Sequence, residues 1–202
     1  MIDLNDGAAK NNIMRAFAGE CMAETRYLLA EAAAMKQQLA VIAKLFRFTA
    51  EQERQHAKVL QELMGGFNVS DIDIAAGYPV FFSDDIQQLL DFAVKGETTE
   101  SRNVYPDFAR IARDEGNIEA AEKLEMIGAV EEAHLKRFEY YAGLMRSGKL
   151  FRSDDENECW ICLNCGHIHT GKEPPQECPL CGSPIGWRIR ETEASFAFGG
   201  ML

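Results

Sequence analysis

The sequence predicts a mainly α protein, with a four-helix bundle followed by a small β/loop metal-binding module. Two observations carry this prediction. Glu-x-x-His motifs, Glu53–His56 and Glu131–His134, recur 78 residues apart, and a lone glutamate precedes each by 33 or 34 residues. Two Cys-x-x-Cys pairs lie close together near the end of the chain. The first pattern is typical of a dinuclear metal site inside a helical bundle, and the second of one ion held by four thiolates.

The first half of the bundle is expected over residues 5–35 and 38–64. Both ranges lack proline, are rich in helix-forming residues and repeat apolar side chains every three to four positions. A pair of glycines, Gly65-Gly66, should end the second helix. Residues 67–82 show no helical period and should form a crossover connection.

The second half begins at a capping sequence. Ser83 or Asp84 can N-cap a third helix, with Asp85 in its first turn. That helix should run to about residue 115, and a fourth should cover 117–147, because a glycine directly follows each range. The long connection between the second and third helices fits a ferritin-like topology.

The two halves of the bundle repeat each other. Residues 19–27 (GECMAETRY) resemble residues 96–105 (GETTESRNVY). The offset between the leading glutamates is 77 and that between Tyr27 and Tyr105 is 78, so one extra residue lies between Glu97 and Tyr105. A π-bulge would accommodate it, and such bulges often mark functional sites.

Each candidate ligand lies on the apolar stripe of its helix, where unpaired carboxylates are costly unless cations neutralise them. The two Glu-x-x-His motifs also contain the only histidines of the bundle. Carboxylates with two imidazoles suit iron or manganese better than structural zinc. The predicted ligands of the dinuclear site are Glu20, Glu53, His56, Glu97, Glu131 and His134.

Three more side chains are candidates at this site. Glu100 lies one turn after Glu97 on the same face and is either a further ligand or a surface charge. Tyr27 and Tyr105 hold matching positions of the repeat, and they either pack in the core or hydrogen-bond to a ligand.

The C-terminal module is defined by its cysteines. Cys162–Cys165 and Cys178–Cys181 are separated by 12 residues, and a glycine follows each pair. Structural zinc is the common occupant of such a site, whereas iron would carry single electrons. We expect iron, because a dinuclear redox site on the same chain needs electrons. Cys159, just outside the first pair, is the less favourable ligand.

Composition excludes some partners. The net charge of −11 disfavours nucleic acid, whose phosphates would be repelled. No apolar run approaches the roughly 20 residues of a membrane span, and residues 1–12 lack the apolar region of a secretion signal. The paired cysteines are then best interpreted as metal ligands in a reducing, cytoplasmic compartment.

Taken together, these motifs resemble the rubrerythrin family over essentially the whole chain. The resemblance implies a ferritin-like bundle over residues 1–148, a linker or the start of the next unit over 149–158, and a rubredoxin-like domain over 159–202. Glu24, Cys159 and His167 depart from the family pattern at positions that are not ligands. The matching motifs are Gly19-Glu20, Glu53-x-x-His56, Gly96-Glu97-x-x-Glu100, Glu131-x-x-His134, Trp160-x-Cys162-x-x-Cys165-Gly166 and Cys178-Pro-x-Cys181.

The resemblance implies a non-haem di-iron peroxidase that reduces hydrogen peroxide to water in oxidative-stress defence. The iron of the four-cysteine site would relay electrons from an external reductase or rubredoxin. Glu53 and Glu131 would bridge the two irons. Glu20 would bind one iron, and Glu97 and His134 the other.

The remaining candidates have roles that the same resemblance implies. His56 would bind the first iron in the reduced form, and Glu100 would replace it in the oxidised form. Tyr27 and Tyr105 would hydrogen-bond to ligands. An iron-storage protein or ferroxidase on the same bundle, and an interaction protein with a zinc ribbon, are the competing interpretations.

The spacing also predicts an oligomer. Glu131 and Gly148 are 17 residues apart, so the di-iron site lies about 25 Å from the end of its own fourth helix. Either the connection folds back, or a head-to-tail homodimer or higher oligomer places each ribbon beside the bundle of another chain. Related rubrerythrins assemble in the second way.

Overall fold

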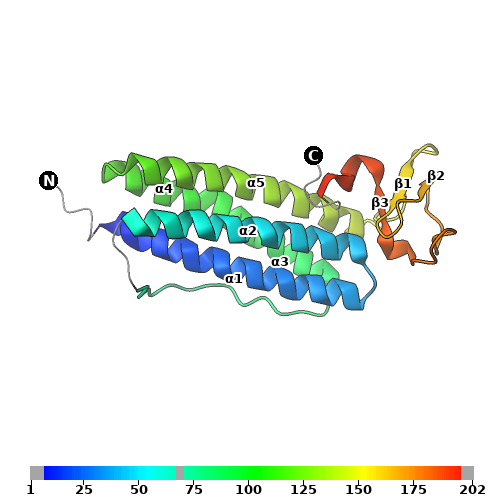
Figure 1. Cartoon of the computed structure of the whole chain (residues 1–202), viewed down its shortest axis with the longest axis horizontal. Helices are drawn as coiled ribbons and strands as arrows, with labels where there is room; N and C mark the ends of the chain where they lie inside the picture. The colour runs from blue at the N-terminus through cyan, green and yellow to red at the C-terminus, as the bar shows by residue number, and fades with distance from the viewer. Residues whose placement is uncertain (1–6, 67–70, 197–202) are drawn as a thin grey trace.

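The computed structural model of the chain describes residues 7–66 and 71–196. Its helices form rods that lie side by side as a bundle (Figure 1). The third rod is made of α3, a π-helical segment and α4 in direct succession. The elements are α1 (Ala8–Lys36), α2 (Ala40–Gly66), α3 (Ile86–Thr99), the π-helical segment η2 (Glu100–Val104), α4 (Tyr105–Asp114) and α5 (Ile118–Arg146). The predicted four-helix bundle is confirmed.

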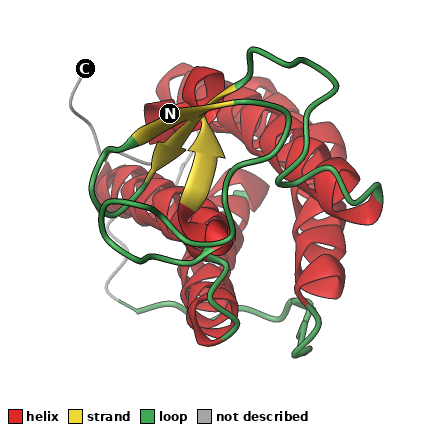
Figure 2. Cartoon of the chain, turned by 90° about the vertical axis from the view of Figure 1, so that its right-hand side faces the viewer, coloured by secondary structure: helices red, strands yellow, loops and turns green. Residues whose placement is uncertain are grey.

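The C-terminal module is a small antiparallel sheet with two short 3-10 helices. Its strand order is β2-β1-β3, and Figure 2 shows the sheet lying across one end of the bundle. The elements are β1 (Cys159–Cys162), β2 (Ile168–Thr170), η3 (Ile185–Trp187), β3 (Arg188–Arg190) and η4 (Glu191–Phe196). The prediction of a β/loop module after the bundle is therefore also correct.

The helix ends follow the predicted signals with one correction. Asp85, rather than Ser83 or Asp84, is the N-cap of α3, because its extended backbone lets the carboxylate accept hydrogen bonds from the amides of residues 87 and 88. The Ser83 hydroxyl accepts from the Asp85 amide instead. Asn117 caps α5, and Gly148, with φ +67°, follows its end.

The crossover connection runs along the outside of α1 (Figure 1). Its first residues, 67–70, lie outside the described part of the chain, and residues 71–82 contain neither helix nor strand. The Tyr78 hydroxyl donates to the Arg15 carbonyl at 2.8 Å, which ties the connection to α1. Among the described residues, no helix has both the length and the apolar character to cross a membrane.

The extra residue of the second repeat is absorbed as a π-helical turn, as the sequence predicted. The turn covers Glu100–Val104 and leads directly into Tyr105, whose side chain is only 2% exposed. A Cβ on Gly128 would lie 2.9 Å from the Cβ of Tyr105, so α4 and α5 are in close contact here. The π turn therefore takes up the extra residue locally and leaves Tyr105 directed into the core.

Deleting Asn103, an exposed residue of this turn, should be tolerated. Without the extra residue the turn closes as regular α-helix, as the matching residues 20–27 do in α1, and Tyr105 keeps its place in the core. Denaturant unfolding should therefore show a loss of no more than about 1 kcal/mol in the free energy of unfolding. Asn103→Ala keeps the residue count and should stay within about 0.5 kcal/mol of the parent. A deletion that costs about 3 kcal/mol or more, the loss expected if Tyr105 left the core, would contradict this account of the turn.

The core is divided into two apolar clusters by a layer of polar side chains. One cluster surrounds Phe46 and Phe138, and the other surrounds Leu60 and Leu124. On each rod, the buried glutamates and, where present, the histidine lie between the residues of the two apolar clusters. The bundle therefore isolates its polar centre from solvent at both ends.

The C-terminal module packs on the end of the bundle formed by the α1–α2 turn. Leu163 and Ile189 belong to the same apolar cluster as Val41. A Cβ on Gly186 would lie 1.9 Å from the Gln38 carbonyl oxygen, so only glycine permits this contact. The module therefore docks closely on its own bundle.

Residues 149–158 contain no helix or strand, yet they are bound to both units. The Arg190 guanidinium donates to the carbonyls of Lys149 and Arg152 at 2.7 and 2.8 Å, and Leu150 is buried in the bundle's apolar cluster. These contacts favour the start of the next unit over a free linker. The domain boundaries themselves stay a prediction.

Candidate metal centres

The buried layer of the bundle contains two overlapping groups of potential metal ligands. In each group one donor atom per residue lies within 4.8 Å of all the others. The groups share Glu53 and Glu131, so the geometry describes two adjacent ion positions with two carboxylates between them. The first group is Glu20, Glu53, His56 and Glu131, and the second is Glu53, Glu97, Glu131 and His134.

The two imidazoles are placed with approximate symmetry. Nδ1 of His56 lies 2.9 Å from Glu131, 3.2 Å from Glu53 and 3.6 Å from a carboxylate oxygen of Glu20. Nδ1 of His134 lies 2.7 Å from Glu131 and 3.1 Å from Glu53, and the two rings stack with their centroids 5.7 Å apart. This is the arrangement that the repeated Glu-x-x-His motif predicted.

Several of these close atoms do not form hydrogen bonds with each other. Among the described residues, both carboxylate oxygens of Glu131 and Nδ1 of His134 are buried without a hydrogen-bond partner, as is one oxygen each of Glu53 and Glu97. Buried polar atoms rarely lack a hydrogen-bond partner. Their lone pairs converge on common points instead, which is the geometry that metal ions require.

The electrostatics of the buried layer also indicate a site for metal ions. Burial raises the pKa of Glu20 well above its ordinary value and that of Glu97 to about 8. Burial would lower the pKa of His56, but its short contacts with Glu131 and neighbouring carboxylates outweigh this and raise the pKa to about 12. Four carboxylates buried together thus demand positive charge, which divalent cations would supply in place of protons.

The tyrosines predicted beside the site both hydrogen-bond to ligand candidates. The Tyr27 hydroxyl donates to Glu97, and the Tyr105 hydroxyl donates to Glu20. Tyr27 also packs against Phe46, so it serves the core as well. The alternative left open by the sequence is resolved in favour of hydrogen bonding, and each tyrosine fixes the orientation of one carboxylate.

One polar contact could not be predicted from the sequence. Nε2 of His134 lies 3.0 Å from the side-chain oxygen of Gln52, which also accepts from Arg137. Gln52 thereby fixes the tautomer that leaves Nδ1 of His134 free to bind a metal. The matching position of the other repeat is Val130, so comparing the two repeats did not point to Gln52 as a functional residue.

Glu100 lies outside both groups of clustered donors. It lines a cavity of about 380 Å³ that is also lined by Glu20, Arg26, Tyr105 and residues of the crossover. Burial, with Glu97 next in effect, raises its pKa well above the ordinary value. In this structure His56 occupies the first group and Glu100 faces the cavity.

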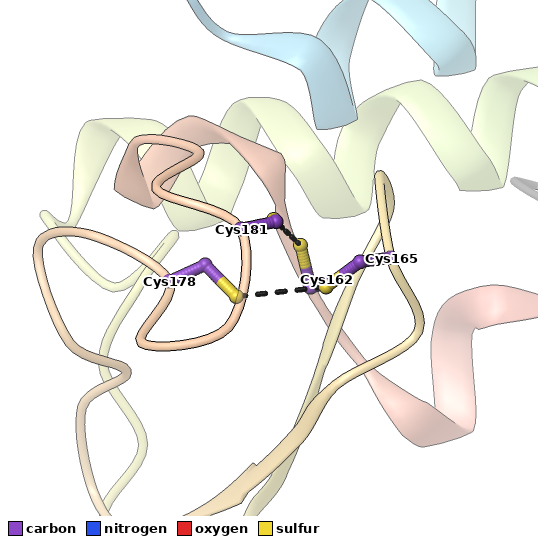
Figure 3. Close-up of side chains that lie close together, drawn as sticks. All are labelled: Cys162, Cys165, Cys178 and Cys181. Atoms are coloured by element: carbon purple, nitrogen blue, oxygen red, sulfur yellow. Dashed lines mark hydrogen bonds between the residues drawn. The ribbon is translucent and has the colours of Figure 1, made fainter.

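The four predicted cysteine ligands meet in the C-terminal module (Figure 3). Sγ of Cys162 lies 3.8 Å from Sγ of Cys181, and Sγ of Cys165 lies 3.6 Å from Sγ of Cys178. A tetrahedron with metal–sulfur bonds of about 2.3 Å has edges of about 3.8 Å, so the cage fits one tetrahedral ion. Cys159 lies outside the cage, near Asn157 and Thr170.

Local backbone geometry builds the cage. Gly166 and Gly182, which follow the two cysteine pairs, have φ of +76° and +73°, a conformation that favours glycine. The amides of these glycines donate to the carbonyls of Cys162 and Cys178. The hydroxyl of Ser183, 3.3 Å from Sγ of Cys181, is the largest of the causes that lower the pKa of Cys181 to about 5, which favours the thiolate.

Comparisons with known proteins agree with this geometry. Residues 11–141 match the family model described as Rubrerythrin, and residues 160–185 match that of the rubrerythrin rubredoxin-like domain. A rubrerythrin from Clostridium perfringens is 40% identical over 185 residues, covering 91% of this chain and 94% of the relative. A rubrerythrin from Nitratidesulfovibrio vulgaris is 38% identical, with the same coverage of each chain.

Solved structures show the same architecture. A mixed-valence nigerythrin matches with a TM-score of 0.62 at 27% identity, covering 91% of this chain and 86% of that one. A bacterioferritin from Desulfovibrio desulfuricans, at 18% identity and a TM-score of 0.64, shares the bundle fold over 70% of this chain and 81% of that chain. This chain therefore belongs to the rubrerythrin family and carries a di-iron ferritin-like site together with a rubredoxin-like four-cysteine site.

Proposed function

We propose that this chain is a hydrogen peroxide reductase that protects the cell against oxidative stress. Hydrogen peroxide takes up two electrons and two protons, its O–O bond breaks, and two water molecules form. The observation that carries the proposal is the pair of ion positions sharing Glu53 and Glu131 on a chain that also has a four-cysteine site. Two irons held by these groups would supply both electrons, and an iron held by the four cysteines would supply one-electron transfer from an external reductase or rubredoxin.

The proposed ligand roles follow the two groups. Glu53 and Glu131 would be shared by both irons, since both belong to each group, and Glu20 would bind at the first position. Glu97 and His134 bind at the second position. His56 would bind at the first position in the reduced form and Glu100 would replace it in the oxidised form; in this structure His56 lies with the first group and Glu100 lies outside it.

The cavity beside the site is large enough to bind the substrate. Its volume of about 380 Å³ admits a molecule as small as hydrogen peroxide up to Glu20 and Glu100. Burial raises the pKa of the Glu100 carboxyl, which favours its protonated form, and its place on the cavity wall suits it to exchange a proton with a molecule bound there. Tyr105 holds Glu20 in place during this transfer.

The loaded protein should contain three irons per chain, two in the bundle and one in the ribbon. One ligand set is oxygen and nitrogen and the other is all sulfur, so the two sites are independent. Metal analysis and the absorption spectrum of anaerobically purified native protein measure this, with ferric-thiolate bands reporting the ribbon. Zinc in the ribbon with no redox-active metal in the bundle would refute the peroxidase proposal and favour an interaction protein.

We also propose a head-to-tail homodimer or higher oligomer as the working unit, in the reducing cytoplasm where thiolates persist. The ribbon docks at the α1–α2 turn, and Leu39 there is 14 residues from Glu53, about 21 Å along α2. Electron transfer weakens steeply over such a distance. A partner chain running in the opposite direction would bring its ribbon beside this bundle.

A further inference from the structure

Arg188 is a buried cation that the bundle and the di-iron site do not explain. Its side chain is only 1% exposed. Its one hydrogen bond among the described residues runs from Nη1 to the carbonyl oxygen of His167 at 3.1 Å, and its Nε and Nη2 are buried without a partner. A buried guanidinium without a compensating anion is costly, so an anion is expected beside it.

The neighbouring arginine shows what a satisfied buried guanidinium looks like in this module. Arg190 pairs with Glu158 at 3.4 Å and Glu193 at 3.6 Å, and its guanidinium lies 4.8 Å from the centre of the Trp160 ring. It also donates to two backbone carbonyls. Among the ion pairs of the described residues, none compensates Arg188 in this way.

The position of Arg188 identifies the missing anion. It lies directly opposite Cys162 in the antiparallel pairing of β1 with β3, and opposite residues project from the same face of a sheet. The carbonyl oxygen of His167 accepts from both the Cys162 amide, at 2.9 Å, and the Arg188 guanidinium. Arg188 is therefore buried on the same face of the sheet as Cys162 and shares the His167 carbonyl with the first knuckle of the cage.

We propose that Arg188 is the built-in counter-charge of the four-cysteine iron centre and raises its reduction potential. Four thiolates around ferric iron carry one net negative charge, and the same four around ferrous iron carry two. A fixed positive charge in a dry environment stabilises the doubly negative form more. Reduction adds one electron and no proton, so the guanidinium favours the reduced ribbon. The proposal rests on iron in the ribbon and not on peroxide chemistry.

Three substitutions separate charge from packing and hydrogen bonding. Arg188→Lys keeps the charge, Arg188→Gln keeps a hydrogen-bond donor for His167, and Arg188→Met keeps neither. The iron-loaded full chain is titrated against redox mediators, with the ferric-thiolate absorbance as the signal. The glutamine and methionine variants should lower the equilibrium constant for reduction at least about tenfold, which is about 59 mV for one electron. The lysine variant should stay near the parent.

The control is Arg152→Met, which removes a charge from an exposed position of the same module while keeping the carbonyl that Arg190 uses. It should leave the potential unchanged. Parent-like potentials in the glutamine and methionine variants would overturn the proposal, and so would a lysine variant that falls as far as they do. If the methionine variant does not retain iron, the reduction potentials of the glutamine and lysine variants decide between the two outcomes. Because no peroxide is used, failure of the peroxidase proposal would leave this result intact.

Discussion

Replacing Glu131 by alanine is expected to abolish peroxide reduction even in a single turnover of chemically pre-reduced protein. Glu131 is fully buried, belongs to both ligand groups and lies within 2.9 Å of both imidazoles. Without it neither ion position keeps its full set of donors, so the bundle should lose iron. The rate should fall by more than about a thousandfold, an effect that corresponds to about 4 kcal/mol of lost transition-state stabilisation.

The experiment combines metal analysis with anaerobic addition of one equivalent of peroxide. Glu132→Ala is the matched control, because Glu132 is the next residue on α5, partly exposed and paired with Lys136 at 3.5 Å. It should keep two bundle irons and full activity. Misfolding is not expected to explain a loss, since removing one of four buried carboxylates relieves repulsion in the metal-free bundle. A Glu131→Ala chain that keeps both irons and reacts like the parent would refute the bridging role.

Replacing Cys162 by serine is expected to separate the two activities. Cys162 is fully buried in the ribbon cage, and serine nearly preserves its volume while removing a thiolate ligand. Because the bundle's ligands are untouched, pre-reduced protein should still consume one peroxide per di-iron site. Turnover driven by a reductase should fall by more than about a hundredfold, or about 2.7 kcal/mol, because single electrons no longer reach the bundle.

Cys159→Ser is the control for this change. Cys159 begins the same strand but lies outside the cage, so its replacement should leave the ferric-thiolate bands and the turnover intact. Equal loss of single-turnover and steady-state activity in Cys162→Ser would mean that the ribbon supports the structure of the bundle and does not relay electrons.

The two damaging variants together test the oligomer. A chain with Cys162→Ser has a working bundle, and a chain with Glu131→Ala has a working ribbon. If electrons cross between chains, mixed dimers should regain turnover that neither parent variant has. A verified mixed dimer without recovery, or a fully active monomer, would rule out transfer between chains.

Much of the site could be predicted because its chemistry is tied to helical spacing. The Glu-x-x-His motif places both donors on one face, and the repeat places two such faces opposite each other. The mismatch of one residue between Glu97 and Tyr105 predicted the π turn, because an inserted residue in a packed helix must be absorbed locally. Rules of local geometry sufficed for these features.

The features that sequence could not supply depend on contacts between distant elements. Gln52 meets His134 only because α2 and α5 face each other. The position of Glu100 at a cavity depends on how the crossover covers α1 and α3. Arg188 and Arg190 lie two residues apart on the same strand, and only the fold shows that Arg190 has carboxylate partners whereas Arg188 is buried without one. The N-cap at Asp85 differed from the expected residue by one or two positions because several adjacent side chains can cap.

The most direct test of the peroxidase proposal is the oxidation of fully reduced protein by hydrogen peroxide compared with dioxygen at equal concentrations. Rapid mixing under anaerobic control gives both rates, and titration gives the stoichiometry. The account predicts that each di-iron site consumes one hydrogen peroxide, and that this reaction is at least about tenfold faster than the reaction with dioxygen, a difference of about 1.4 kcal/mol in activation free energy. Faster oxidation by dioxygen, or ferric iron accumulating without consumption of peroxide, would contradict it and favour a ferroxidase.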